Sequence, residues 1–305
     1  AEKRVFLAIL AISWFWLIGA TFLTQFPSFT KNILHADASV VTLFLVIFTI
    51  GVACGSLVCN RLLKHRISMK WIPISLWLMS IFMIDLYFAS NHLIYTEKLT
   101  NFAGFFHSIT HWRICIDLLG LSVSGGIYAV PLYTLIQTDT ATEHRARTIA
   151  ANNIINSLFI VIASIIIVFL LKIDLNVTQI FLLLGVINTG LAIYATRLIP
   201  QGLIKPFLRK ILRCLYDVKL SGFENYKGAG ESVVIVANHT SFLDVVLIYA
   251  FLPDELLFAI NSFTSRIWWI RPFLYFSKVF ELDPLNPLAI KTLATSNLSD
   301  RVEYR

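Results

Sequence analysis

Charged residues are scarce in this chain. Only 14% of its 305 residues are charged, against 57% that are hydrophobic, whereas about a quarter of a typical soluble domain is charged. This composition excludes a protein that is soluble along its whole length. The shortage is also uneven, because residues 5–200 are mostly apolar and residues 201–305 have the mixture of a globular domain.

Cysteine is rare as well, with four residues whose spacing fits no metal site. Three of them lie in or beside apolar segments, where we expect small apolar fillers rather than disulfides. His107 and His111 are four residues apart, but no third ligand is near them in the sequence. We therefore expect no metal site and no bound cofactor.

A secretory signal is also missing. The chain begins at Ala1 without a Met and enters a long apolar segment at once, so we expect a piece of a longer protein. No basic and aromatic patch falls in the globular part, which argues against a nucleic-acid partner.

Long apolar runs fill the first two thirds of the chain. A membrane-spanning helix needs about 20 apolar residues, and six segments qualify: 5–26, 40–63, 71–90, 113–136, 149–171 and 179–199. Lys and Arg number 13 on the side of both termini and 4 on the other. We therefore expect six spans with both termini in the cytoplasm, and the net charge of +7 is mostly an orientation signal.

Several polar residues fall inside the expected spans and are candidates for a transport path. Asp85 and Asp117 are acids in apolar helices, which either mark such a path or lie near a helix end beside a base. Asn152, Asn153 and Asn156 either line a cavity for a polar headgroup or bond to neighbouring helices. Small residues that let helices approach closely recur on two spans: Gly51, Gly55 and Ser56, then Gly120, Ser124, Gly125 and Gly126.

Residues 203–216 predict an amphipathic helix. Lys205, Arg209 and Arg213 recur every four residues, and apolar residues fill the other face. This pattern suits a helix lying on an anionic leaflet. The alternative is a basic helix that packs on its own domain.

The globular part carries one motif with chemical meaning. The apolar run 232–237 predicts a buried strand, and His239 follows it with Asp244 five residues later. A neutral imidazole can take a proton from a substrate hydroxyl while a carboxylate orients the ring. Ser241 and Asp244 also fit a helix capping box, in which His239 would be a polar loop residue. Later strands at 256–260 and 278–282, with a helix at 266–276 between them, predict an α/β layer.

Residues 1–200 resemble the six C-terminal helices of major facilitator superfamily transporters, and more narrowly bacterial lysophospholipid transporters. The stretches that carry the resemblance are 13–16, 25–27, 130–133 with Gln137, and 150–156. The glycine-acid-base loop signature is degraded, since Cys59 and Asn60 stand where an acid and a base are usual. The resemblance implies half of a major facilitator fold, and a half needs a second half to enclose a pathway.

Residues 207–305 resemble glycerolipid acyltransferases, through Asn238–Asp244 with 218–225 and 280–287. They look most like the acyltransferase part of bacterial 2-acylglycerophosphoethanolamine acyltransferase/acyl-carrier-protein synthetases. The resemblance implies that His239 is the base and Asp244 its orienter, with Asn238 and Ser241 as substrate-binding candidates. It also implies an acyl-carrier-protein or CoA thioester as acyl donor. The family's third, phosphate-binding motif is not in the sequence, which leaves the headgroup open, although lysophosphatidylethanolamine suits the transporter half.

Together these patterns predict a membrane all-α bundle over 1–200, a basic surface helix over 201–217, and an incomplete α/β acyltransferase domain over 218–305. The expected activity is lysophospholipid uptake coupled to reacylation at a bacterial inner membrane, with membrane lipid and acyl-carrier protein as partners. Two alternatives are a transporter or scaffold with an inactive acyltransferase remnant, and an acyltransferase on a membrane anchor that does not transport.

Overall fold

The computed structural model describes residues 2–63, 69–91, 99–199, 203–228, 235, 242–252, 256–261 and 278–282. The chain divides into two compact units, Ala1–Gly202 and Leu203–Arg305. We describe each unit by itself.

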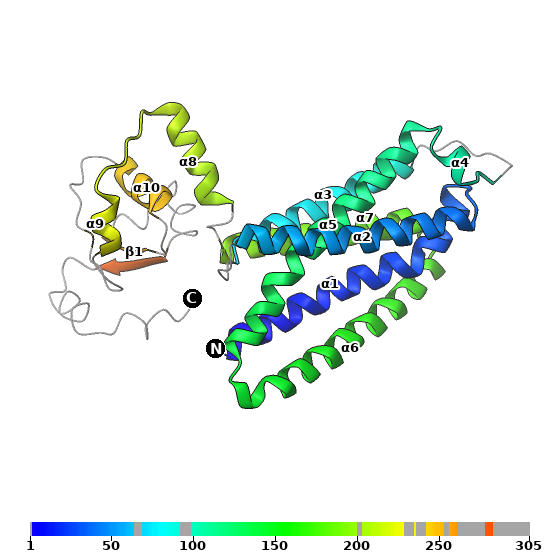
Figure 1. The fold of residues 1–305 in the computed structure, drawn as a ribbon, viewed down its shortest axis with the longest axis horizontal. Coiled ribbons are helices and arrows are strands. Elements are labelled where there is room, and N and C mark those ends of the chain that lie inside the picture. Colours follow the sequence, from blue (N-terminus) through cyan, green and yellow to red (C-terminus); the bar gives the residue numbers. More distant parts are fainter. Residues whose placement is uncertain are drawn as a thin grey trace. The chain divides into compact units, whose positions relative to one another are not determined.

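The first unit is built from helices (Figure 1): α1 (Glu2–Ser28), α2 (Ala38–Leu63), α3 (Trp71–Ser90), α4 (Phe102–Phe105), α5 (Ile109–Asp139), α6 (Arg145–Lys172) and α7 (Val177–Leu198). A π-helical segment, Phe29–Ile33, continues α1. Six of these helical segments are long and apolar enough to cross a membrane. The six predicted helices are confirmed, and five of them are longer than the apolar runs because residues at their ends, such as Arg145, join the helices.

Helix α5 lies at the centre of this unit, where it packs against α1, α2 and α3. Helix α6 stands at the edge, beside α1 (Figure 1), and most of its side chains are exposed. A run of aromatic side chains fills the core between α1, α2, α4 and α7: Phe22, Phe26, Phe29, Phe44, Phe105 and Phe181. The stacked pair Phe22 and Phe181, with ring centroids 4.2 Å apart, joins α1 to α7.

Small residues bring α2 and α5 into backbone contact, as the sequence predicts. A Cβ on Gly55 would lie 2.1 Å from the carbonyl oxygen of Val123, and one on Gly126 would lie 2.4 Å from that of Val52. Only glycine leaves room for backbones this close. The two helices are therefore locked together over this stretch.

Three helices of this unit begin with side-chain caps, and at α4 the Asn101 side chain accepts from the backbone N–H of Gly104. At α7, the Asn176 side chain accepts from the backbone N–H of Gln179, and the Gln179 side chain accepts from the backbone N–H of Asn176. At α2, the Asp37 carboxylate accepts from the backbone and the hydroxyl of Ser39. These bonds hold the pKa of Asp37 below its usual value, because hydrogen bonds to a carboxylate favour its charged form.

The second unit contains α8 (Ile204–Leu215), α9 (Phe223–Gly228), α10 (Phe242–Phe251), β1 (Leu257–Asn261) and β2 (Lys278–Leu282). Strands β1 and β2 pair in parallel, with Leu257 opposite Lys278 and Asn261 opposite Leu282. Both strands lie where the sequence predicts them. The predicted strand at 232–237 and helix at 266–276 lie outside the described residues, apart from Ile235.

The residues Gly-Phe-Glu-Asn at 222–225 predict a turn, and the structure has the start of a short helix there. Gly222 has a positive φ of 75°, and α9 begins directly after it. The backbone N–H of Asn225 donates to the carbonyl of Gly222. The expected turn is thus the first turn of a short helix, because glycine supplies the left-handed conformation that leads the chain into it.

Candidate functional site

The described part of the expected catalytic motif is the start of α10. Asp244 lies in the first turn of this helix, half-buried. A carboxylate there is favoured by the helix dipole and by the free N–H groups of the first turn. His239, Asn238 and Ser241 lie outside the described residues. The capping-box and catalytic interpretations both place Asp244 in this turn and both stay open.

Apolar packing fixes the orientation of α10 within its unit. Leu243, Val246 and Leu247 project from one side of the helix and, with Ala250 and Phe251, pack around Leu212 of α8. This spacing is the period of an amphipathic helix face. Because α10 is held along its length, the direction of Asp244 in the first turn is set by the same contacts.

Basic residues of α8 hold the other end of α10. Lys205 is buried, and its Nζ donates to the carbonyl of Leu252 at 3.2 Å. The Nε of Arg209 donates to the carbonyl of Ala250, and the Arg213 guanidinium lies 5.6 Å from the centre of the Phe251 ring. Cations at the last carbonyls of a helix are favourable.

These contacts correct the expectation that the basic stripe of α8, formed by Lys205, Arg209 and Arg213, faces an anionic leaflet. The sequence predicts a helix at 203–216, and α8 is there, but Lys205 and Arg209 point into their own domain rather than outward. The physical reason is that the C-terminal carbonyls of α10 need donors, and these two side chains supply them.

In the membrane half, the two acids of the expected spans have different surroundings. Asp85 of α3 pairs with Arg113 of α5, whose Nε donates to Oδ2 at 2.9 Å. Asp117 is buried in the interior of the bundle, as the sequence predicts, and its Oδ2 has no hydrogen-bond partner among the described residues. Asp85 therefore follows the interpretation as an acid beside a base, and Asp117 lies next to the same pair, with its carboxyl against that of Asp85 and near Arg113.

The asparagines at the start of α6 also separate into different roles. Asn156 is buried and accepts from the Ser13 hydroxyl of α1 at 2.8 Å, so it forms a hydrogen bond between α6 and α1. Asn153 is exposed. Asn152 is buried, and it lines a cavity of about 180 Å³ between α5 and α6.

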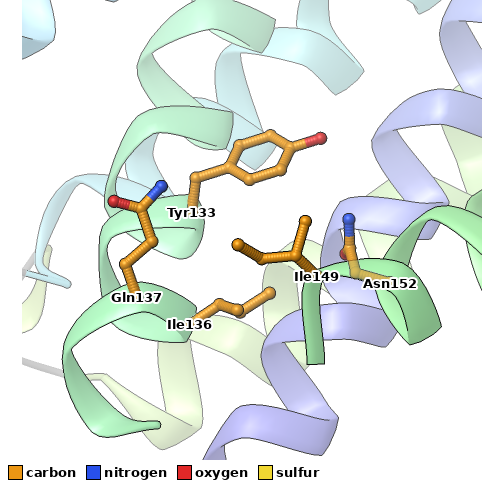
Figure 2. Close-up of a pocket in the computed structure, with 5 residues that line it drawn as sticks. All are labelled: Tyr133, Ile136, Gln137, Ile149 and Asn152. Carbon is orange, nitrogen blue, oxygen red and sulfur yellow. The ribbon is translucent and has the colours of Figure 1, made fainter. Parts of the chain in front are cut away.

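Figure 2 shows this cavity, where Tyr133, Ile136 and Gln137 of α5 face Ile149 and Asn152 of α6. The Oδ1 of Asn152 is buried without a partner among the described residues. The Tyr133 hydroxyl accepts from the Trp16 indole at 2.9 Å, so its own proton is available. The cavity thus offers both donors and acceptors against apolar walls, which is the usual character of a small-molecule site.

Further polar atoms without a partner gather along the same junction. Thr140 Oγ1 and Arg145 Nε are buried and unpaired among the described residues, like Asn152 Oδ1. Arg145, Ile149 and Asn152 recur at the spacing of one helix face. In the sequence, Arg145 is one of the 13 basic residues that predict the orientation of the spans, and its spacing from Ile149 and Asn152 is the pattern by which a role at this junction could have been recognised.

The two histidines considered as metal ligands bond to backbone instead. His107 Nδ1 lies 2.9 Å from the carbonyl oxygen of Ala103, and His111 Nδ1 lies 2.6 Å from that of Phe105. The His111 ring also stacks on the Phe105 ring at 4.1 Å. Both rings therefore have structural partners at the start of α5.

Comparison with protein families identifies the second unit. Residues 217–302 match the family model described as Acyltransferase. This range contains both the 238–244 motif and α10. No solved structure matches the chain.

Proposed function

From an acyltransferase domain joined to six candidate membrane helices, we propose that this protein acylates a lysophospholipid at the membrane surface. The observation that carries the proposal is the family match over 217–302, because it contains His239 and Asp244 at the spacing of a base and its orienter. The substrate is a lysophospholipid because the domain follows a multi-pass membrane region, from which a lipid substrate is within reach. Lysophosphatidylethanolamine is the headgroup that we favour.

The proposed chemistry needs no residue of the protein as nucleophile. His239 takes the proton from the free glycerol hydroxyl, whose oxygen attacks the carbonyl carbon of an acyl thioester. The C–O ester bond forms, the C–S bond breaks, and the imidazolium returns its proton to the leaving thiolate. Asp244 holds the imidazole in the reactive tautomer and stabilises its charged form.

The acyl donor in this proposal is a thioester of acyl-carrier protein or CoA. Both donors are cytoplasmic, so the domain must face the cytoplasm of a bacterial inner membrane. The Lys and Arg asymmetry of the spans supports this orientation.

The decisive experiment replaces His239 in the longer protein that the resemblance implies. Transfer of a labelled acyl group to lysophosphatidylethanolamine in proteoliposomes is measured for His239→Ala, Asp244→Asn and Lys219→Ala. Loss of a general base lowers the rate by about 10²–10⁴-fold, and we expect a steep loss for Asp244→Asn as well. Lys219 is 84% exposed in an ion pair with Asp217, so Lys219→Ala is the control with an unchanged rate.

Three outcomes separate the proposal from its alternatives. If His239→Ala keeps the wild-type rate, the catalytic assignment is wrong and the capping-box interpretation stands. If no variant and not even the unchanged protein transfers acyl groups, the domain is an inactive remnant. If acylation is normal but no lysophospholipid crosses the bilayer, the spans are an anchor.

We further propose that the membrane half takes up lysophospholipid for this reaction. The cavity between α5 and α6 supports this second function, because Asn152 Oδ1, the Tyr133 hydroxyl and Gln137 can bond to a polar headgroup. The donor that Asn152 requires matches the ammonium of an ethanolamine headgroup.

Uptake of labelled lysophospholipid into proteoliposomes tests this assignment. We expect Asn152→Ala to reduce uptake without reducing acylation of lysophospholipid already on the domain side. Ser157→Ala is the matched control, because Ser157 is exposed on α6 and its hydroxyl donates to the carbonyl of Asn153 in the same helix. Equal uptake by the Asn152→Ala variant and the wild type would remove the cavity from the transport path.

A further inference from the structure

An apolar stripe on α8 is exposed and has no partner among the described residues of its unit. Phe207 is 64% exposed, Ile211 is 36% exposed and Leu215 is 68% exposed. Residues four apart fall on one side of a helix, so these three side chains form a continuous stripe. The apolar surface continues past the helix, where Tyr216 is 50% exposed.

The opposite side of α8 is occupied by α10. Lys205 and Arg209 donate to the last carbonyls of α10, and Leu212 packs among its apolar residues. At 3.6 residues per turn, these three positions centre on the side of the helix away from the apolar stripe. One side of α8 therefore packs against α10, and the apolar stripe lies exposed on a different side of the helix.

Connection to the spans identifies what covers this face. Helix α7 ends at Leu198 and α8 begins at Ile204, six residues later. At 3.3–3.6 Å per residue, this connection keeps the start of α8 within about 22 Å of the end of a candidate membrane span. The nearest apolar phase to an exposed apolar helix face at that distance is the lipid bilayer.

Charge next to the stripe supports the same occupant. Pro206, Arg209, Lys210 and Arg213 line an open groove of about 350 Å³ on α8. Lys210 and Arg213 are exposed, and Lys210 lies beside the apolar stripe on the helix surface. Cations along the edge of an apolar helix face suit the phosphates above the acyl chains.

We propose that α8 docks in the leaflet through Phe207, Ile211 and Leu215, with Lys210 at the phosphates and α10 on the side away from lipid. The apolar side chains contribute more to this attachment than the charges do, because Lys205 and Arg209 already donate to carbonyls at the end of α10. Docking of this kind fixes the first turn of α10, with Asp244, to a helix that lies in the membrane plane.

Spin labels test this orientation in the whole chain. Single cysteines at 207, 211, 215 and 219 are labelled in a cysteine-free background and reconstituted in phosphatidylethanolamine and phosphatidylglycerol nanodiscs. We expect labels at 207, 211 and 215 to collide more with oxygen than with a water-soluble nickel chelate. The label at 219 should show the reverse, because Lys219 is exposed to water beyond the helix.

Two further results decide between lipid and other occupants. Raising the salt concentration should leave the oxygen preference at 211 intact, since the stripe rather than the charges holds the helix. Phe207→Lys with Leu215→Lys should move the label at 211 toward the nickel chelate. Equal exposure of all four labels to the chelate would overturn the proposal. So would labels at 207, 211 and 215 that neither reagent reaches, because protein would then cover the stripe.

Discussion

The backbone contact between α2 and α5 leads to a prediction that can be worked out in numbers. An ideal Cβ at Gly55 would lie 2.1 Å from the oxygen, 2.8 Å from the carbon and 3.0 Å from the Cα of Val123. All three are backbone atoms, which cannot turn aside as a flexible side chain can. The substitution Gly55→Ala must therefore push the two helices apart.

The size of this effect follows from the missing space. Ordinary contacts between carbon atoms are at about 3.5–4.0 Å, so the helices must separate locally by roughly 1 Å. Overpacking of this kind costs about 1–3 kcal/mol, and we take about 3 because the same contact also includes Gly126. For a unit of roughly 200 residues, this cost lowers Tm by about 6–12 °C.

Buried thiols give a direct assay. Cys59 and Cys115 are buried, so a thiol-reactive dye reports their exposure as the detergent-solubilised protein is heated. Gly190→Ala is the matched control, because a Cβ on Gly190 meets nothing within 4 Å. Helix propensity gives that variant up to about 1 kcal/mol of added stability. The reasoning is refuted if Gly55→Ala melts at or above the wild-type temperature.

The remaining predictions concern charged groups. Asp117→Asn should leave Tm unchanged or raise it, because a buried acid with an unpartnered Oδ2 beside the Asp85 carboxylate is removed, whereas Asp85→Asn should lower Tm slightly through loss of a partly exposed ion pair; a larger loss at Asp117 in the same thiol assay would contradict this. Reporter fusions after Arg4 and Arg213 should both read cytoplasmic, and an external signal at either would reverse the topology. Because the pKa of Asp37 is lowered from its usual 3.8, its contribution to stability is present at neutral pH and is lost as the pH falls through the lowered pKa. Asp37→Asn should therefore lower Tm at neutral pH and converge with the wild type in acid, and a pH-independent difference would argue against the cap.

Much of the fold could be predicted because its signals are local. Six apolar runs predict six helices, since a helix in lipid must satisfy its backbone bonds within the segment. Strand β2 matches its predicted range of 278–282, and the following Asp283-Pro284 marks its end in the sequence. Helix α9 was missed because Gly222 reads equally well as part of a turn and as the residue before a helix.

The functional residues were predictable only in part. His239 and Asp244 are predicted from a contiguous motif, and both their roles and their pairing stay a prediction. The cavity between α5 and α6 was recognised through Asn152 alone, since Tyr133 and Gln137 reach it from another helix. No spacing along the chain indicates which residues of two different helices will face each other.

The sequence alone predicted six candidate membrane helices and the segment that matches the acyltransferase family, because apolar length and a contiguous motif are properties of single segments. Only the tertiary structure decided the direction of each amphipathic face. In α8 the basic stripe was expected to face outward, but the carbonyls at the end of α10 accept from Lys205 and Arg209, and Phe207 and Leu215 are left exposed. Periodicity shows that a helix has two faces, whereas the partner that satisfies one of them is brought by folding from more than 40 residues away.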